Sequence, residues 1–191
     1  MGMKLEQEDL DPLLTAHQAW LTGRGGQRLE LQRADLSQLN LRWADLRGCR
    51  LNAVDLNGAS LMRADLRGAD LKRCRLISAE LVGANLMEAD LSFADLSHSD
   101  MYEAELSGCS AMKADFRWAN LMRVRAQGAL FMWTLFYHSD LRRADLRDAN
   151  LMGANLTGAR LHGTCFWGAH SAHVNLMGAT GLLRGGMAEV P

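Results

Sequence analysis

A chain of 191 residues, 48% of them hydrophobic, is long enough to bury the core of one ordinary domain. Its 21 basic and 22 acidic residues give a formal net charge of −1, which argues against a general nucleic-acid-binding protein and against an acidic tail. The chain begins without a basic and apolar leader pattern and contains no run of 18 apolar residues. We therefore expect a soluble cytoplasmic protein that does not enter a membrane and keeps its four scattered cysteines reduced.

Residues 8–21, with the sequence EDLDPLLTAHQAWL, are predicted to form a short amphipathic helix. Gly23, Gly25 and Gly26 follow closely and are expected to end it. The residues that share helical spacing, and so are expected to form its apolar face, are Leu10, Leu13, Leu14, His17, Trp20 and Leu21.

A five-residue repeat occupies residues 29–178, in 30 copies without an insertion. The central position, which begins at Leu31, is Leu in 22 of the 30 copies. The position two residues earlier is Ala in 18 copies, as in Ala144-Asp145-Leu146. No copy carries a charge at either position, and all 34 charges of the repeats fall on the other three positions. These two positions are therefore expected to point into a core.

An α-helix does not account for this pattern, because five residues turn a helix by about 500° and the Leu positions would spiral around it. Two apolar positions with one residue between them indicate a short extended segment whose side chains point to one side. The remaining residues must turn the chain so that the next pair also points inward. Repetition closes a coil, and stacked coils pair their backbones ~4.8 Å apart to make a solenoid.

The distribution of glycine indicates how many sides each coil has. Eleven of the 30 copies have Gly two residues after the central position, where a tight corner favours a positive φ. Sorted by every third copy, these glycines spread 4, 4 and 3, but sorted by every fourth copy they spread 1, 3, 2 and 5. The unequal spread favours four sides and a coil of 20 residues.

The tandem A-[DN]-L-x-x pattern of residues 29 to about 178 strongly resembles the pentapeptide-repeat proteins. The resemblance implies an all-β solenoid, a right-handed quadrilateral β-helix, here with a short N-terminal capping α-helix. About seven and a half coils would make a rod of roughly 36 Å.

The two ends are expected to be covered, because an exposed coil edge invites end-to-end stacking. Residues 1–28 are interpreted as the capping helix with its linker, and residues 29–178 as the repeat domain. Residues 179–191 are interpreted as a C-terminal cap or tail, in which Leu182 and Leu183 cover the other end or mediate dimerisation.

The sequence predicts no catalytic residue and no cofactor. Cys49, Cys74 and Cys109 take the inward small position and are expected in the core. Asp or Asn precedes the central residue in 17 of 30 copies, which is typical of repeated turns facing solvent. There is no glycine-rich phosphate loop and no nucleophile motif, and a filled solenoid has no interior cavity for a substrate. We therefore predict a protein that is not an enzyme.

No metal site is predicted either. His162, Cys165, His170 and His173 look at first like zinc ligands. The repeat register places them on three successive sides of one coil, whereas tetrahedral zinc needs every ligand within about 2.3 Å of one point. They are interpreted as surface side chains.

One region has large apolar residues at positions that should point outward. Asp or Asn would be usual at positions 130 and 135, but both are Leu. Exposed apolar patches of this kind usually mark an interface, whereas the alternative is that these side chains only cover the backbone of the solenoid. The predicted aromatic–methionine patch consists of Phe93, Met112, Trp118, Leu130, Met132, Trp133, Leu135, Tyr137 and Met152.

Two hypotheses for function follow. The first is a non-enzymatic rod that binds a protein partner, or a second copy of itself as a homodimer, through the aromatic–methionine patch, without contacting nucleic acid or membrane. The second comes from the resemblance, because some pentapeptide-repeat proteins bind DNA gyrase and related topoisomerases as DNA mimics and protect them from quinolones or peptide toxins. The four sides carry about +2, −2, +2 and −2, so no side is a sustained acidic strip and the first hypothesis is favoured.

Overall fold

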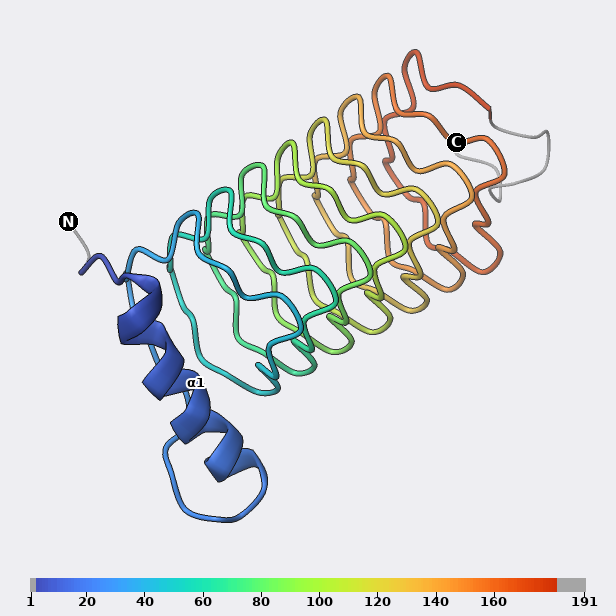
Figure 1. Cartoon of the computed structure of the whole chain (residues 1–191). Coiled ribbons are helices and arrows are strands. Elements are labelled where there is room, and N and C mark those ends of the chain that lie inside the picture. Colours follow the sequence, from blue (N-terminus) through green and yellow to red (C-terminus); the bar gives the residue numbers. More distant parts are fainter. Residues whose placement is uncertain (1–2, 182–191) are drawn as a thin grey trace.

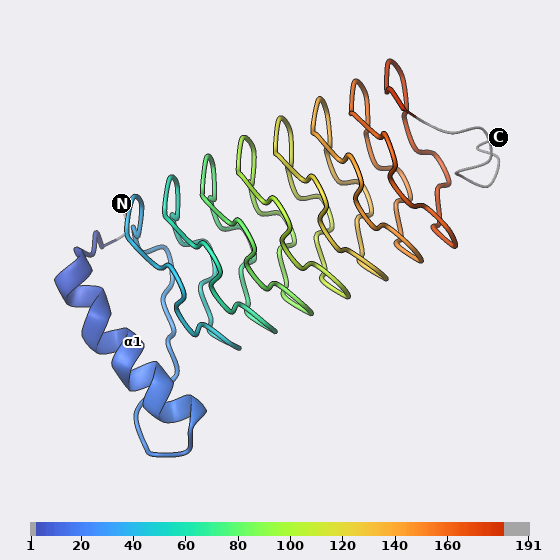
Figure 2. The ribbon, with the colours of Figure 1, turned by 45° about the vertical axis from the view of Figure 1, so that its right-hand side comes forward.

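The computed structural model describes residues 3–181 as one helix followed by a rod of stacked coils (Figure 1). Helix α1 spans Gln7–Leu21 and lies at the N-terminal end of the rod, against the first coil. Seen from the side, the coils stack with their planes parallel, and α1 and the last described coil lie at opposite ends of the rod (Figure 2). The predicted helix and the predicted solenoid are both confirmed.

The coils pair in parallel with a register of 20 residues, as in the bridge between Asp65 and Asn85. A typical copy pairs with both neighbouring coils: Leu66 N donates to Asn85 O of the next coil at 2.7 Å, and Asp65 N donates to Ala44 O of the preceding coil at 2.9 Å. Each side contributes one bridge residue, at every fifth position from Glu30 to Thr180, and residues 3–181 contain no longer strand. The predicted 20-residue coil with four sides is therefore correct, and the fold is a right-handed quadrilateral β-helix.

We number the sides by their first central residue: side 1 begins at Leu31, side 2 at Leu36, side 3 at Leu41 and side 4 at Leu46. The corner residue of each copy is the one two positions after the central residue. A row is the set of residues that occupy the same position in successive coils, 20 residues apart.

The core is formed by the two inward positions of each copy. Every central residue is buried except Leu31 and Leu176, which lie in the end coils and are partly buried. Three phenylalanines fill the middle of the rod, where Phe116 stacks on Phe136 with ring centroids 5.3 Å apart and Phe131 meets Phe136 edge-on at 5.2 Å. The small central residues Ala111 and Ala126 lie beside these rings in the register and balance their volume.

Every corner residue has a positive φ, whether or not it is glycine. Nineteen of the 30 corners carry another residue, for example Ala53 with a φ of 57° and Trp133 with a φ of 60°. An Asp or Asn before the central residue supports the turn, as Asp55 Oδ1 accepts a hydrogen bond from Asn57 N at 3.0 Å. The turn-forming role predicted for these residues is confirmed. It does not by itself account for the corners without glycine, because Ala53 and Trp133 belong to copies that have Arg50 and Leu130 in place of the Asp or Asn.

The N-terminal cap differs in detail from the prediction. α1 buries Leu10 and His17 and half-buries Leu14, which lie on one line of the helix, three to four residues apart. Leu13 and Trp20, expected on the same apolar face, are exposed at 37% and 40%. The expectation was wrong for these two because a helix lying on a narrow coil edge buries a stripe, whereas the sequence pattern covers a wider face.

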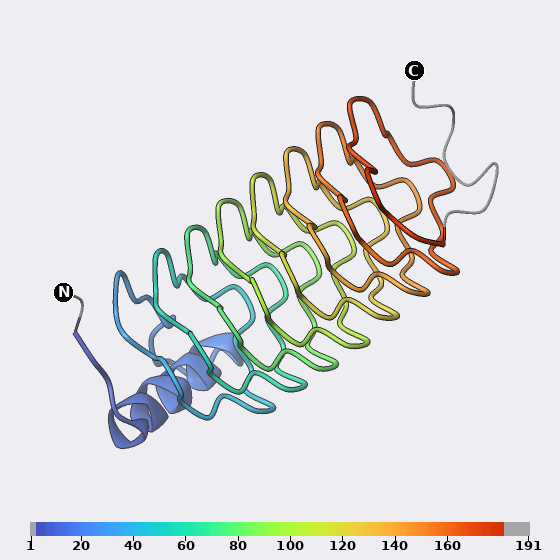
Figure 3. The same ribbon diagram turned by 90° about the horizontal axis from the view of Figure 1, so that it is seen from above.

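A short segment before α1 extends the sheet, which the sequence did not indicate. Asp35 N donates to Met3 O at 2.8 Å and Leu5 N donates to Asp35 O at 3.0 Å, so Lys4 pairs with Asp35 as one more parallel bridge. Viewed from above, α1 lies across the end of the rod and beside this first coil (Figure 3). The expectation for Leu182 and Leu183 lies outside the described residues.

Candidate interaction surface

The aromatic–methionine patch lies on sides 1 and 2 and on the corners that follow them. Leu130 and Leu135 take bridge positions of these two sides, where most copies have a polar residue, and they are exposed at 39% and 37%. Met132 and Tyr137 follow the two buried central phenylalanines and are half-buried. The structure therefore brings these four side chains onto one continuous surface.

The corner row after side 2 is a stack of rings. Trp118 lies between His98, at a centroid distance of 6.4 Å, and His138, at 4.3 Å, with all three rings close to parallel. Tyr137 meets the edge of Trp118 at 5.8 Å and of His138 at 4.1 Å. Trp118 nevertheless keeps 51% of its surface exposed. Stacking fixes the orientation of the indole and leaves half of it available for contact.

The corner row after side 1 contains Phe93, Lys113 and Trp133 in successive coils. The Lys113 ammonium lies 5.6 Å from the centre of the Phe93 ring, within the range of a cation–π contact. Phe93 and Trp133 are exposed at 50% and 53%. Trp133 lies over Gly153, the next corner residue, which has no side chain to push the indole away.

A row of methionines borders these aromatic corners on side 1. Met112, Met132 and Met152 occupy the same position in three successive coils, and all three are half-buried. Unbranched thioether side chains adapt to different contact shapes, which suits a surface that binds another molecule. All nine residues of the predicted patch thus lie at the surface, partly buried or about half exposed, and none lies in the core.

The patch continues into an uncharged surface that the sequence analysis missed. Sides 1 and 2 of the last coils consist of residues 129–138, 149–158 and 169–178, and these 30 residues include no Lys, Arg, Asp or Glu. We call this surface the neutral strip. It is visible in the sequence once the 20-residue register is known, but not from the charge summed over a whole side.

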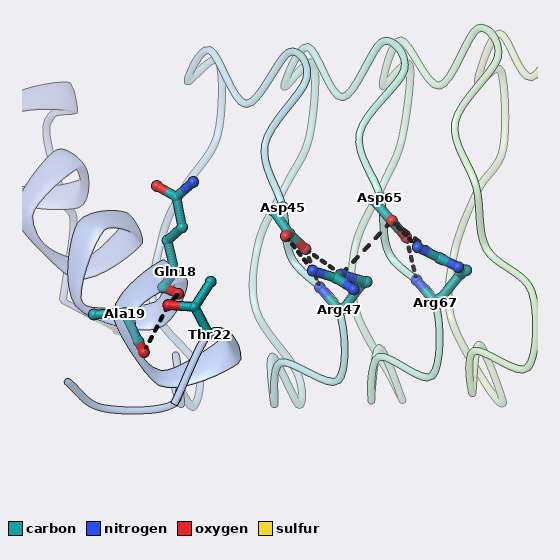
Figure 4. Close-up of polar contacts among 7 residues, drawn as sticks. All are labelled: Gln18, Ala19, Thr22, Asp45, Arg47, Asp65 and Arg67. Atoms are coloured by element: carbon teal, nitrogen blue, oxygen red, sulfur yellow. Dashed lines mark hydrogen bonds and ion pairs between the residues drawn. The ribbon is translucent and has the colours of Figure 1, made fainter. Parts of the chain in front are cut away.

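Ion pairs lie on all four sides along the rod, but in the last described coils they are found on sides 3 and 4. Arg47 lies between Asp45 of its own copy and Asp65 of the next coil, with Nη2 2.7 Å from Asp45 Oδ2 and Nε 3.8 Å from Asp65 Oδ2 (Figure 4). Hydrogen bonding from Arg47 lowers the pKa of the Asp45 carboxyl. Arg142 repeats the arrangement with Asp140 at 2.6 Å near the other end of the rod. The two halves of the circumference therefore differ sharply in charge in the last coils.

Two further exposed tryptophans lie away from the patch. Trp43, at a corner of side 3, is exposed at 63% and holds the Arg63 guanidinium 4.8 Å from its ring centre. Trp167, on side 4, is exposed at 73%. They show that exposure of one tryptophan does not define the patch, whose distinguishing feature is the grouping of apolar side chains on sides 1 and 2, next to and within the coils where these sides lack charge.

The candidates set aside in the sequence analysis lie where the register places them. Cys49, Cys74 and Cys109 are buried, and burial raises the pKa of the Cys49 and Cys74 thiols to about 12. Cys165 is exposed, on a different side from Cys109.

His162, Cys165 and His170 are exposed on sides 3, 4 and 1 of one coil, and His173 is exposed at the corner after His170. Within residues 3–181, no group of three His, Cys, Asp or Glu side chains is arranged to hold a metal ion. Over the same residues, no helix is long and apolar enough to cross a membrane.

Comparison with known families agrees with this geometry. The model of pentapeptide repeats matches the chain in 8 copies, over residues 30–68, 55–92, 64–101, 89–125 and 129–168. The chain belongs to the pentapeptide-repeat family. The five-residue repeat that builds the 20-residue coil of this pentapeptide-repeat protein is thus the repeat of this family, and the resemblance seen in the sequence is confirmed. A comparison with curated proteins finds no match.

Several solved pentapeptide-repeat structures are similar to the chain. HetL, involved in heterocyst differentiation regulation in Nostoc sp. strain PCC 7120, is 22% identical with a TM-score of 0.46, and the match covers 97% of this chain and all of HetL. QnrB1, a plasmid-mediated fluoroquinolone resistance protein, is 22% identical with a TM-score of 0.49, over 80% and 82% of the two chains. A protein of the Arabidopsis thaliana thylakoid lumen is 29% identical with a TM-score of 0.20, over 51% and 64%. Because the identities are low and the TM-scores are below 0.5, these similarities do not assign a binding partner or a biological process to this chain.

Proposed function

We propose that this pentapeptide-repeat protein is a non-enzymatic interaction rod that binds a partner protein through the aromatic–methionine patch. One observation carries the proposal: Trp118 and Trp133 remain about half exposed, at 51% and 53%, on the two corners that flank side 2. Large aromatic side chains on a rigid scaffold supply contact area at low cost in conformational entropy, and such residues dominate binding energy at protein interfaces.

The neutral strip indicates the chemistry of that partner. Six of the nine patch residues lie on the neutral strip, and Phe93, Met112 and Trp118 lie in coils that carry charges such as Lys113. The strip favours a partner whose contacting face is apolar or uncharged, because a charged group brought onto it would lose water without gaining an ion pair. The half-buried row of Met112, Met132 and Met152 lets the surface adjust to the shape of that face. Association should therefore depend little on ionic strength.

The DNA-mimic alternative has less support from the side-chain contacts. The bridge rows of sides 2 and 4 carry four carboxylates each, but both are interrupted by arginine: Arg125 pairs with Glu105 on side 4, and Arg75 pairs with Asp55 at 3.2 Å on side 2. Farther along side 2, Arg117 pairs with Asp115 at 2.6 Å, and the next position in that row is Leu135. A partner that recognises DNA needs a sustained row of uncompensated negative charge, and both rows are interrupted and partly neutralised.

The test is capture of a partner from a lysate of the native host, followed by direct affinity measurement with the purified partner. The double change Trp118→Ala with Trp133→Ala should weaken binding at least tenfold and leave the circular dichroism spectrum unchanged. A matched control is Trp43→Ala with Trp167→Ala, which removes two indoles that are equally exposed or more so but lie on sides 3 and 4. That control should bind as the wild type does.

Three outcomes would count against the proposal. Equal losses in the two double variants would show that the patch is not the binding surface. Steep weakening of binding by added salt would indicate an electrostatic interface elsewhere. Recovery of a type II topoisomerase with such a salt dependence would favour the DNA-mimic alternative. Sedimentation velocity of the purified protein distinguishes a separate partner from a second copy of the chain.

A further inference from the structure

The N-terminal segment covers the first coil by several different contacts. On side 2, the backbone of residues 3–5 pairs with Asp35. On side 3, the Gln7 side chain replaces a peptide group, because its Nε2 donates to Asn40 O at 3.1 Å and its Oε1 accepts from Asn40 N at 2.9 Å. Beyond the helix, Arg28 Nε donates to Gly48 O at 2.6 Å. The cap thus satisfies backbone groups that the coil edge would otherwise expose.

His17 is the buried polar residue of this cap. It is 0% exposed, and its Nδ1 accepts a hydrogen bond of 3.0 Å from the backbone N of Leu29, where the chain enters the first coil. Because Nδ1 is an acceptor, the neutral ring carries its proton on Nε2, and that atom is buried without a hydrogen-bond partner. The ring also stacks on Trp20, with centroids 5.5 Å apart. The contact with Leu29 therefore requires the neutral form of His17.

The charged groups that face His17 come from the linker and from side 4. Arg28, in the linker, lies with its guanidinium 5.5 Å from the Trp20 ring centre, and its positive charge disfavours a second charge on His17. On side 4, the Asp45 carboxylate and the backbone carbonyl of Arg47 favour protonation, while the Arg47 guanidinium opposes it. Burial is the largest effect, and the net result is a lowered pKa of His17.

We propose that His17 is a pH-sensitive latch that holds α1 on the first coil and releases it when the imidazole is protonated. Protonation would turn Nδ1 into a donor facing the Leu29 N–H, so the hydrogen bond would be lost and two donors would oppose each other. It would also place a charge in a contact that is 0% exposed. Release would uncover Leu10 and the Asn40 edge, which no other described segment covers.

The pH range follows from linkage. The docked state has the lower pKa, so it binds the proton less readily than the undocked state. Docking is therefore fully favourable above the ordinary histidine pKa of about 6.5 and is weakened as the pH falls below it. If undocking is coupled to the uptake of one proton, the equilibrium constant for undocking rises about tenfold for each pH unit below about 6.5, until the pH reaches the pKa of His17 in the docked state.

The experiment is hydrogen exchange of the α1 amides in the full chain between pH 7.5 and 5.5, corrected for the intrinsic exchange rate. This range lies above the ordinary carboxyl pKa values, so the Asp–Arg pairs do not titrate. The wild type should show an opening equilibrium that rises about tenfold per pH unit below about pH 6.5. His17→Gln keeps an oxygen that can accept from Leu29 N but does not titrate, so its opening should not change with pH.

His162→Gln is the matched control, because His162 is an exposed histidine of the coils and its loss should leave the wild-type response. A pH response in His17→Gln equal to that of the wild type would overturn the proposal, as would a wild type without a response. If His17→Gln does not hold α1 at pH 7.5, the ring resonances of His17 in the wild type decide. A titration midpoint clearly below about 6.5 supports the latch, and a midpoint at or above it refutes the latch.

Discussion

The indole ring of Trp133 lies against the backbone of Gly153, the corner residue one coil further along the rod. A Cβ atom at Gly153 would overlap the six-membered part of the ring. The exposed aromatic corner and the glycine corner are therefore one packing unit, and the glycine supports the proposed interaction surface although it would not contact a partner itself.

This relationship predicts the cost of adding one methyl group. Gly153→Ala should destabilise the protein by about 1 kcal/mol for a non-glycine residue at a φ of 68°, and by at least as much again for displacing Trp133. Gly128→Ala, at a φ of 65° with no atom within 4 Å of the new Cβ, should show only the first cost. Urea unfolding measures both. In a Trp133→Ala background the two glycine variants should become equal, and a persistent difference would mean that the ring is not its cause.

The repeat register places Leu86 in the core and Met87 at the surface, so the same substitution at the two positions should affect stability very differently. Leu86 is 0% exposed, so Leu86→Asp should cost well over about 3 kcal/mol by placing an unpaired charge in the core. Met87 is 37% exposed, and Met87→Asp should change stability by no more than about 0.5 kcal/mol. Thermal unfolding followed by circular dichroism distinguishes them. A wild-type melting temperature for Leu86→Asp would contradict the register.

The cysteines should differ in reactivity toward a thiol reagent. Cys49, Cys74 and Cys109 are buried, and burial raises the pKa of each thiol, which suppresses the reactive thiolate. Cys165 is exposed. Ellman's reagent should therefore detect one thiol per chain in the native protein and four after denaturation. Chelator and reductant should leave the melting temperature unchanged, and unfolding by either would show that a metal or a disulfide holds the fold.

Substitutions of Asp145 can distinguish how much its turn hydrogen bond and its ion pair each contribute to stability. Its Oδ1 accepts from Arg147 N at 3.2 Å, and its Oδ2 lies 2.6 Å from Arg147 Nη2. Asp145→Asn should keep the turn bond, since Asn150 Oδ1 makes the same bond to Met152 N at 3.1 Å, and should cost less than about 1 kcal/mol. Asp145→Ala loses the turn bond and the ion pair, together with the hydrogen bond that Oδ2 accepts from Gln127 Nε2 at 3.0 Å, and should cost about 1 kcal/mol more. Equal losses in chemical denaturation would indicate that the ion pair is the main contribution.

The sequence alone was sufficient for the repetitive part of the fold because that part depends on short-range, periodic chemistry. The Leu and Ala positions fix which side chains are buried, and the 20-residue register then fixes which residues lie side by side, as in the stack of Phe116 on Phe136. The outward positions of Leu130 and Leu135 follow from the same register. Glycine gave a weaker signal than expected, because 19 corners adopt a positive φ without it.

Only the tertiary structure decided how the first coil is covered and how the exposed rings lie. The pairing of Gln7 with Asn40, the bridge of Lys4 to Asp35 and the burial of His17 depend on how a single helix meets a coil edge, and no repeat encodes that meeting. In the same way, the register places Trp118 near His138, but only the side-chain conformations bring their rings to 4.3 Å and leave half of the indole exposed. Periodic contacts are set by spacing along the chain, whereas these contacts are set by packing between segments whose spacing does not repeat.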